Sequence, residues 1–284
     1  MDSGQLPDTA AIGDVIQRNH VNRRGSGRQT LLLAHGFGCD QQMWRFLLPQ
    51  LENDFELVLF DYVGSGQADM RAYSRSRYQD LTGYAQDIVD ICLALDLTDV
   101  VLVGHSVSSI IGLLAAEQLG QRLRGIVMVC PSPCFLNRPP QYFGGFEATD
   151  LQELIDLMDK NYIGWAGFLA PLVTGLEQDH PITGQLYNSF CTTNPMSAKT
   201  FAKATFFSDH RDLLPKAQLP VLILQSEQDA LAAPAIGQYM QHHLPNSQLV
   251  VIAARGHCLH MTHPQEVAQQ IKHFVHFLAV AAQT

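Results

Sequence analysis

The segment from Val100 to Leu114 constrains the fold of this chain more strongly than any other part of the sequence. Its first four residues are apolar and mostly β-branched, which predicts a buried strand. After Ser106 the apolar residues recur at intervals of three and four, which is the period of a helix. Between the two lies Gly104-x-Ser106-x-Ser108, where small residues let a strand and a helix pass close to each other. The sequence therefore predicts a serine on a sharp turn from a buried strand into a helix.

A serine on such a turn is the nucleophile elbow of α/β-hydrolases, in which a strained backbone lifts the hydroxyl clear of the sheet. The usual pattern ends in glycine, and the serine at position 108 is a mild departure because its side chain is also small. The spacing alone carries little weight, so the prediction rests on the strand before it and on the helix after it, which ends at Gly120. We interpret Ser106 as a nucleophile; the alternative is a serine in an ordinary strand-to-helix turn.

The order of the predicted elements is typical of a parallel sheet with helices on both faces. Apolar strands are predicted at residues 30–34, 57–60, 100–103, 125–130, 221–225 and 248–253. Before the first strand we expect a basic, glycine-rich turn at residues 22–27. After that strand we expect a helix that is capped by Asp40 and stops near Pro49. A final helix carries Pro264 in its first turn.

From Phe135 to about Leu214 the alternation of strands and helices breaks, and four helices are predicted near residues 150–162, 165–176, 183–191 and 197–207. Aromatic side chains are dense here, as in a helical insert that packs on itself or in a cap with an apolar underside. An insert that follows the strand after the elbow would lie over Ser106. We therefore expect an α/β-hydrolase core of residues 1–134 and 215–284. A four-helix lid of residues 135–214 is expected to be inserted after the strand that ends near Cys130.

The acidic composition of the chain argues against several classes of partner. The net charge of −9 disfavours nucleic acid and anionic membranes. No apolar run approaches the length needed to span a bilayer, and residues 1–20 lack the features of a signal peptide. The six cysteines are scattered through core-like segments, which favours reduced thiols. We therefore expect a cytoplasmic protein. We also expect no cofactor, because the sequence has neither a G-x-x-x-x-G-K-[S/T] loop nor a dinucleotide fingerprint.

The partners of Ser106 are predicted from chain order, because α/β-hydrolases place an acid and then a histidine after the nucleophile. Asp229 follows the strand at 221–225 and His257 follows the strand at 248–253, so both lie in loops at the carboxyl edge of the sheet. His257 is the predicted general base, and Asp229 is the acid that orients it. Glu227, two residues before Asp229, is the rival acid. Taken singly, each of these residues is also explained as an ordinary loop or capping residue.

Two further features concern the same edge of the sheet. His257, His260 and His263 are spaced three apart, but the flanking residues indicate a loop that runs into a helix, so we predict no metal site. Acyl transfer also needs N–H donors for the developing oxyanion. We assign the N–H of Val107, which opens its helix, and the N–H of Phe37, whose ring would form a wall of the pocket.

Several segments of the chain are similar to one family of known proteins. They are residues 35–41 (HGFGCDQ), 60–66 (FDYVGSG), 104–107 (GHSV), 132–137 (SPCFLN), 161–165 (NYIGW) and 207–211 (FSDHR). In these segments, and from about residue 15 to residue 278, the chain resembles the RsbQ-like α/β-hydrolases. That family includes bacterial proteins of general-stress signalling and the plant karrikin and strigolactone receptors. Leu259 stands where the family usually has proline.

The resemblance implies the same site residues as the motifs, with Ser106, Asp229 and His257 as a triad. It also implies a V-shaped lid of four helices over a small hydrophobic pocket. The aromatic residues expected to line that pocket, in addition to Phe37, are Phe135, Phe146, Trp165 and Phe206.

Two functions follow as hypotheses. The first is a serine hydrolase that cleaves a small hydrophobic ester or lactone through an acyl-enzyme, in a signalling context. The alternative is a ligand-binding signalling module that activates a partner protein, such as a phosphatase, with little or no turnover. The first rests on the triad and the aromatic lid, and the second rests on the resemblance of the lid alone.

Overall fold

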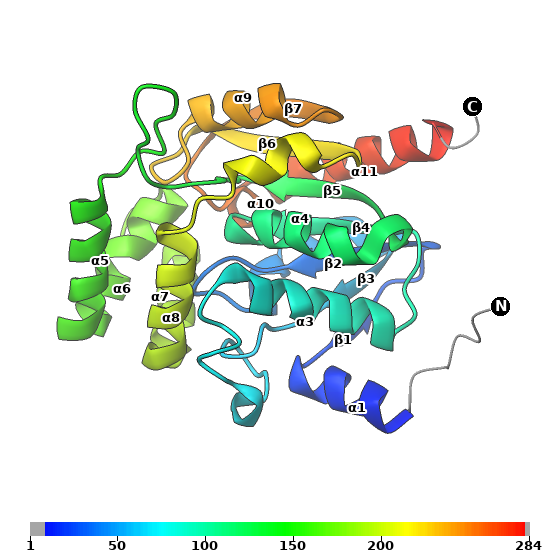
Figure 1. Cartoon of the computed structure of the whole chain (residues 1–284), viewed down its shortest axis with the longest axis horizontal. Helices are drawn as coiled ribbons and strands as arrows, with labels where there is room; N and C mark the ends of the chain where they lie inside the picture. Colours follow the sequence, from blue (N-terminus) through cyan, green and yellow to red (C-terminus); the bar gives the residue numbers. More distant parts are fainter. Residues whose placement is uncertain (1–8, 282–284) are drawn as a thin grey trace.

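In the computed structural model the described residues are 9–281, and they form a seven-stranded sheet with helices on both faces (Figure 1). The strands lie in the order β1-β3-β2-β4-β5-β6-β7. Their bounds are β1 (Asn22–Arg24), β2 (Gln29–Ala34), β3 (Phe55–Leu59), β4 (Val100–His105), β5 (Leu123–Val129), β6 (Val221–Gln228) and β7 (Ser247–Arg255). Neighbouring strands run parallel except β1 and β3, which are antiparallel. The prediction of a mostly parallel sheet is confirmed.

Helices cover both faces of the sheet because alternate residues of each buried strand point to opposite sides. The helices of the core are α1 (Thr9–Arg18), α2 (Leu48–Leu51), α3 (Leu81–Ala94), α4 (Val107–Leu119), α9 (Pro234–His243), α10 (Leu259–Thr262) and α11 (Pro264–Ala281). Leu32 belongs to the core cluster beneath α3, α4 and α9, whereas Leu31 belongs to the cluster beneath α2 and α11. Among residues 9–281 there is no helix both long and apolar enough to cross a bilayer.

Two local predictions near the N-terminal part of the sheet are wrong. The segment expected to be a turn begins with β1, which pairs with residues 57–59. It was missed because all three of its residues are exposed, as befits an edge strand without an apolar pattern. Asp40 does cap the next element by accepting the Gln42 N–H at 2.7 Å, but that element is a single 3₁₀ turn, Gln41–Trp44, followed by the short α2 (Leu48–Leu51). Pro49 lies in the first turn of α2 instead of ending a helix, a position where its missing N–H costs nothing.

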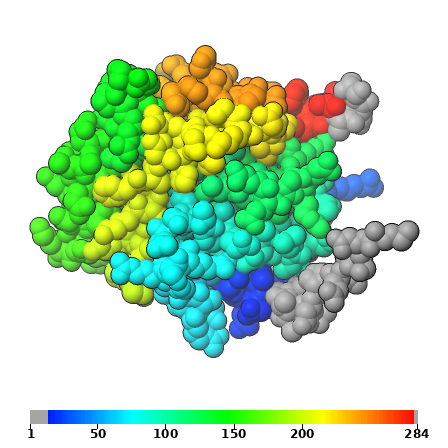
Figure 2. All heavy atoms as spheres, viewed as in Figure 1, coloured from blue at the N-terminus to red at the C-terminus, as the bar shows by residue number. Residues whose placement is uncertain are grey.

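Four helices lie between β5 and β6, and we call α5 to α8 the helical insertion. They are α5 (Ala148–Lys160), α6 (Tyr162–Thr174), α7 (Pro181–Thr192) and α8 (Pro195–Phe206). In Figure 2 the atoms of these helices, green to yellow-green, cover one end of the molecule. The chain enters and leaves the insertion at one place, where Cys134 pairs with Asp209 and the His210 N–H donates to the Pro133 carbonyl at 2.9 Å.

Candidate active site

Ser106 stands at the junction of β4 and α4, on the sharp turn that the sequence predicts. Its φ of 55° and ψ of −121° are an unusual conformation for a residue with a side chain. The close approach of strand and helix needs Gly104, because a Cβ there would lie 2.6 Å from the backbone oxygen of Ser108. The backbone N–H of Ser106 is fixed by a 2.8 Å hydrogen bond to the Val129 carbonyl of β5. The turn therefore presents the hydroxyl at the carboxyl edge of the sheet.

His257 and Asp229 reach Ser106 from the loops after β7 and β6. The Nε2 atom of His257 lies 2.7 Å from the Ser106 Oγ, and its Nδ1 atom lies 2.7 Å from the Asp229 Oδ2. The backbone of His257 is held by the helical insertion, because its N–H donates to the Val173 carbonyl of α6 at 2.7 Å. The rival acid, Glu227, is exposed at the end of β6, and among the described residues it makes no contact with His257.

The other carboxylate oxygen of Asp229 is fixed by the backbone. Oδ1 accepts the N–H of Leu231 at 2.8 Å and the N–H of Ala232 at 3.0 Å. Burial favours the neutral carboxyl, but the neighbouring His257 and the two N–H donors outweigh it, so the pKa of Asp229 lies below its usual value. An ionised Asp229 accepts the Nδ1–H of His257, which leaves the Nε2 lone pair facing the serine hydroxyl.

Cys130 is a neighbour of this pair that the sequence did not single out. Its sulfur, a carboxylate oxygen of Asp229 and a ring nitrogen of His257 lie within 4.8 Å of one another. Cys130 also has a positive φ of 50° and is fully buried at the end of β5. Burial raises the pKa of its thiol, so it packs against the carboxylate as a neutral group. A positive φ at a strand end leaves no mark in the residue pattern, which is why this contact was not predicted.

The two predicted oxyanion donors lie in the elements that flank the elbow. Val107 is the first residue of α4, where a backbone N–H has no partner within the helix and feels the positive end of the helix dipole. Phe37 follows β2 in a turn, and within residues 9–281 its N–H has no backbone acceptor. Both N–H groups are therefore available for a ligand.

A cavity of about 30 Å³ adjoins Ser106 and His257. The side chains that line it are mostly apolar, and six of the fourteen come from the helical insertion. They include Phe37, Phe135, Leu169, Val173, Leu186, Phe190, Phe206 and Leu231. Three of the five predicted lining residues, Phe37, Phe135 and Phe206, are therefore present.

Phe146 and Trp165, which the sequence also predicts as pocket residues, are not among the residues that line this cavity. Trp165 is fully buried behind the wall, with its ring centroid 6.0 Å from that of Phe37. Phe146 packs partly buried against the core, and its backbone pairs with that of Leu136. Leu169 and Val173, which were not predicted, do line the cavity. The density of aromatic residues located the insertion but did not reveal which helix faces point inward.

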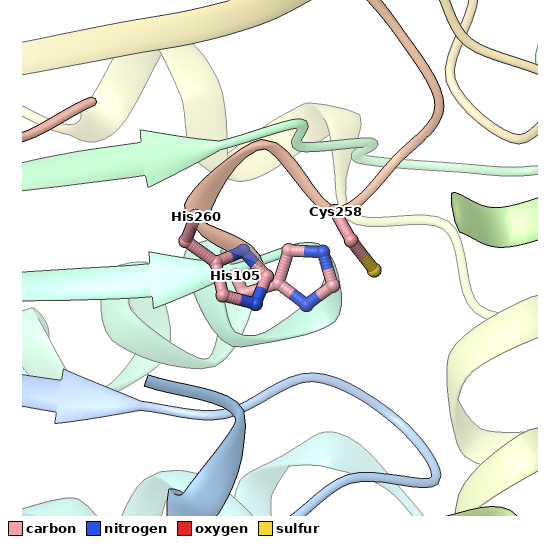
Figure 3. Close-up of side chains that lie close together, drawn as sticks. All are labelled: His105, Cys258 and His260. Atoms are coloured by element: carbon pink, nitrogen blue, oxygen red, sulfur yellow. The ribbon is translucent and has the colours of Figure 1, made fainter. Parts of the chain in front are cut away.

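The histidines spaced three apart do not come together. His260 lies instead against His105 and Cys258, and Figure 3 shows the three side chains close to one another. His263 contacts the Thr262 hydroxyl, and His257 contacts the Ser106 hydroxyl. Both ring nitrogens of His260 and the Nδ1 of His105 have no hydrogen-bond partner among the described residues, but His105 offers a metal little access. Its Nε2 contacts the His257 carbonyl at 2.9 Å, and its Nδ1 faces Gly36, where even a Cβ would lie 2.3 Å away.

The same three side chains are also held in neutral form. Burial lowers the pKa of His105 to about 3, places that of His260 far below its usual range and raises that of the Cys258 thiol. We therefore interpret the group as neutral packing beneath the His257 loop.

Comparison with known proteins agrees with the fold described above. The family model of the alpha/beta hydrolase family matches residues 31–270. The chain belongs to the α/β hydrolase family. Among curated members, this α/β hydrolase is 34% identical to the karrikin insensitive 2 receptor CA of Petunia hybrida, over 95% of this chain and 100% of that protein. It is also 34% identical to a probable esterase of Oryza sativa subsp. japonica, with the same shares covered.

Among solved structures, a hydrolase from Oleispira antarctica is 56% identical, with a TM-score of 0.91 over 93% of this chain and 97% of that one. These relatives confirm the predicted fold class and the predicted resemblance to the family that contains the karrikin receptors.

Proposed function

We propose that this α/β hydrolase cleaves small apolar esters or lactones through Ser106, with His257 as general base and Asp229 as its orienting partner. The observation that carries the proposal is the continuous chain of two 2.7 Å contacts from Asp229 through His257 to the Ser106 hydroxyl. Such a chain activates a serine whose hydroxyl is otherwise a weak nucleophile.

The proposed reaction proceeds in two halves. The Ser106 Oγ attacks the carbonyl carbon while His257 Nε2 takes the hydroxyl proton, and the oxyanion that forms is stabilised by the N–H groups of Phe37 and Val107. His257 then gives the proton to the departing alkoxide, which leaves the acyl group on Ser106. In the second half His257 deprotonates a water molecule, which attacks the acyl carbon and restores the serine. For a lactone, the alcohol and the acid leave as one hydroxy acid.

The cavity limits the substrates that fit. Its volume of about 30 Å³ is small, and its walls are aromatic and aliphatic. Only a short acyl group fits beside Ser106 without movement of the helical insertion. We therefore propose acetyl-sized acyl groups as the preferred substrates of this state, and lactones as substrates that require the helical insertion to move.

The test is hydrolysis of an aryl acetate by the wild type and by Ser106→Ala, combined with mass spectrometry of the quenched protein. We expect turnover and an acetyl adduct on Ser106 in the wild type, and neither in the variant. Ser208→Ala, which removes a hydroxyl that donates to the Thr205 carbonyl at 3.1 Å, is the matched control and should keep full activity. Unchanged turnover in Ser106→Ala would end the proposal.

A second candidate function is signalling, and one observation favours it. The helical insertion carries exposed apolar side chains, with Ile163 55%, Phe168 60% and Met196 58% exposed. Exposed apolar groups on one segment are typical of a surface that meets another protein. The relative named as a karrikin receptor is similar over its full length. We propose that ligand binding rearranges the insertion and that a partner protein reads the change.

Limited proteolysis of Ser106→Ala with and without a small lactone tests this second function, since the variant binds without cleaving. Ligand-dependent cleavage within residues 135–214 supports it, and an unchanged pattern at saturating ligand refutes it. We also propose that residues 135–214 act as a lid on the remainder of the chain. A cytoplasmic location and the absence of a nucleic-acid partner stay predictions of the sequence.

A further inference from the structure

The serine at position 108 departs from the usual elbow pattern, and its side chain has defined partners. Ser108 is fully buried in the first turn of α4. Its Oγ donates to the His35 carbonyl at 2.5 Å and lies 3.0 Å from the Tyr62 hydroxyl. A serine hydroxyl has a single hydrogen, which is used on the carbonyl, so the Tyr62 hydroxyl must be the donor in the second contact.

The partners of Ser108 are themselves joined. The backbone N–H of Tyr62 donates to His35 Nε2 at 3.1 Å, so the ring hydrogen of a neutral His35 lies on Nδ1, which faces the Gly36 carbonyl at 2.9 Å. Burial lowers the pKa of His35 and raises that of Tyr62, which keeps the ring neutral and the phenol protonated. The result is a closed circuit of hydrogen bonds among Ser108, His35 and Tyr62. A glycine at position 108 could not form it.

The circuit joins the two elements that carry the oxyanion donors. His35 is two residues before Phe37, and Ser108 directly follows Val107. The opposite side of the same loop is closed by the elbow strand, because Gly36 packs against the His105 ring so closely that no side chain fits between them. The loop after β2 is therefore held to the elbow from two sides.

We infer that Ser108 is a positioning residue of the oxyanion hole, whose hydroxyl fixes the Phe37 N–H relative to the Val107 N–H. This inference rests on the proposed function for the identity of the hole. An oxyanion is stabilised well only when both donors already point to one place, because they then need no rearrangement as charge develops. Without the Ser108 hydroxyl, the His35 carbonyl and the Tyr62 hydroxyl lose a buried partner, and the loop is free to drift from the elbow.

The test compares Ser108→Gly, which restores the usual pattern, with Ser108→Ala. The matched control is Ser109→Ala, a buried serine of the same helix turn whose hydroxyl bonds the Gly104 carbonyl at 3.0 Å. We expect kcat for an aryl acetate to fall about 10- to 100-fold in both Ser108 variants, somewhat less than the loss of a whole donor. We expect KM to stay within about twofold, because the substrate carbonyl is not yet an oxyanion. The affinity for an aryl trifluoromethyl ketone, whose adduct carries the oxyanion, should fall with kcat.

A merely structural role predicts a different result. In that case the Ser108 variants and Ser109→Ala would lose melting temperature alike, and kcat would be equal in all of them, which would overturn the inference. Ser108→Thr keeps the hydroxyl. At a melting temperature equal to that of Ser108→Ala, its kcat is therefore expected to return toward the wild-type value. A Ser108→Thr variant as slow as Ser108→Ala at equal stability would also count against the inference.

A second measurement does not depend on turnover. The ¹⁵N relaxation order parameter of the Phe37 amide should fall in Ser108→Gly and stay unchanged in Ser109→Ala. If the wild type cleaves no ester but the Phe37 amide loosens in this way, the proposed reaction fails while the positioning role of Ser108 stands. If the order parameter and kcat are both unchanged in Ser108→Gly, the positioning role is refuted and the proposed reaction is untouched.

Discussion

Replacement of Asp229 by asparagine is expected to inactivate the enzyme by reversing the tautomer of His257. The Asp229 Oδ1 accepts two backbone N–H groups, from Leu231 and Ala232. In an asparagine only the oxygen can accept, so the oxygen must occupy this position and the NH₂ group must take the place of Oδ2. That NH₂ group would then face His257 Nδ1, 2.7 Å away in the wild type, and donate to it.

The consequence is a general base that points its hydrogen the wrong way. With Nδ1 as an acceptor, neutral His257 carries its hydrogen on Nε2, directed at the Ser106 Oγ, and has no lone pair there to take the serine proton. We expect kcat to fall about 10⁴-fold, which corresponds to about 5 kcal/mol in the transition state. The variant should still fold, because the side-chain volume and both backbone contacts are kept, and it should lose only the stability that the ionised carboxylate contributes.

The assay combines aryl acetate turnover with ¹⁵N chemical shifts of the His257 ring, which distinguish the two tautomers. Glu227→Gln is the control, and because Glu227 is exposed at the end of β6 we expect its kcat to be within about twofold of the wild type. A variant Asp229→Asn that keeps its hydrogen on Nδ1, or that retains more than a tenth of wild-type kcat, would refute the reasoning. Loss of activity in Glu227→Gln instead would assign the acid to the rival residue.

Three further predictions concern packing, specificity and acid. Gly104→Ala should lower the free energy of unfolding in urea by about 3 kcal/mol, since its Cβ meets the Ser108 backbone at 2.6 Å; an unchanged midpoint would contradict this. Phe206→Leu should raise kcat/KM for a hexanoyl relative to an acetyl ester about tenfold by enlarging the cavity, and an unchanged ratio of rates would place the acyl group elsewhere. The pKa of Asp229 is lowered on folding, so its carboxylate stabilises the protein above the usual pKa of an aspartate and less as pH falls. Urea unfolding from pH 6 to pH 3 should therefore show the advantage of the wild type over Asp229→Asn shrinking with acid; a constant difference would argue against it.

The parts of the fold that follow local rules could be predicted from the sequence. The buried strands are continuous apolar runs, so β4 and the turn at Ser106 were recognisable without a structure. Chain order then pointed to Asp229 and His257, because parallel strands bring their carboxyl ends to one edge. The distances of 2.7 Å between these residues agree with that expectation, while their catalytic roles stay proposals.

The parts that depend on distant contacts could not be predicted. The strand β1 has no apolar pattern because it is an exposed edge. Leu169 and Val173 line the cavity because of the way α6 is rotated, which its almost uniformly apolar sequence does not specify. Ser108 looked like a tolerated substitute for glycine, because its acceptor, the His35 carbonyl, lies 73 residues earlier in the chain. The local sequence pattern therefore located the carboxyl edge of the sheet, whereas tertiary contacts determined which side chains line the cavity there.

The closure at the base of the helical insertion bears on how such proteins diversify. The chain leaves the sheet after β5 and returns before β6 through a short crossing, where the backbone of Cys134 pairs with that of Asp209. Any helical segment whose ends can make that same crossing could replace the present one while the strands keep their neighbours. The residues at the carboxyl edge of the sheet and the helices that cover them can then change independently of each other during evolution.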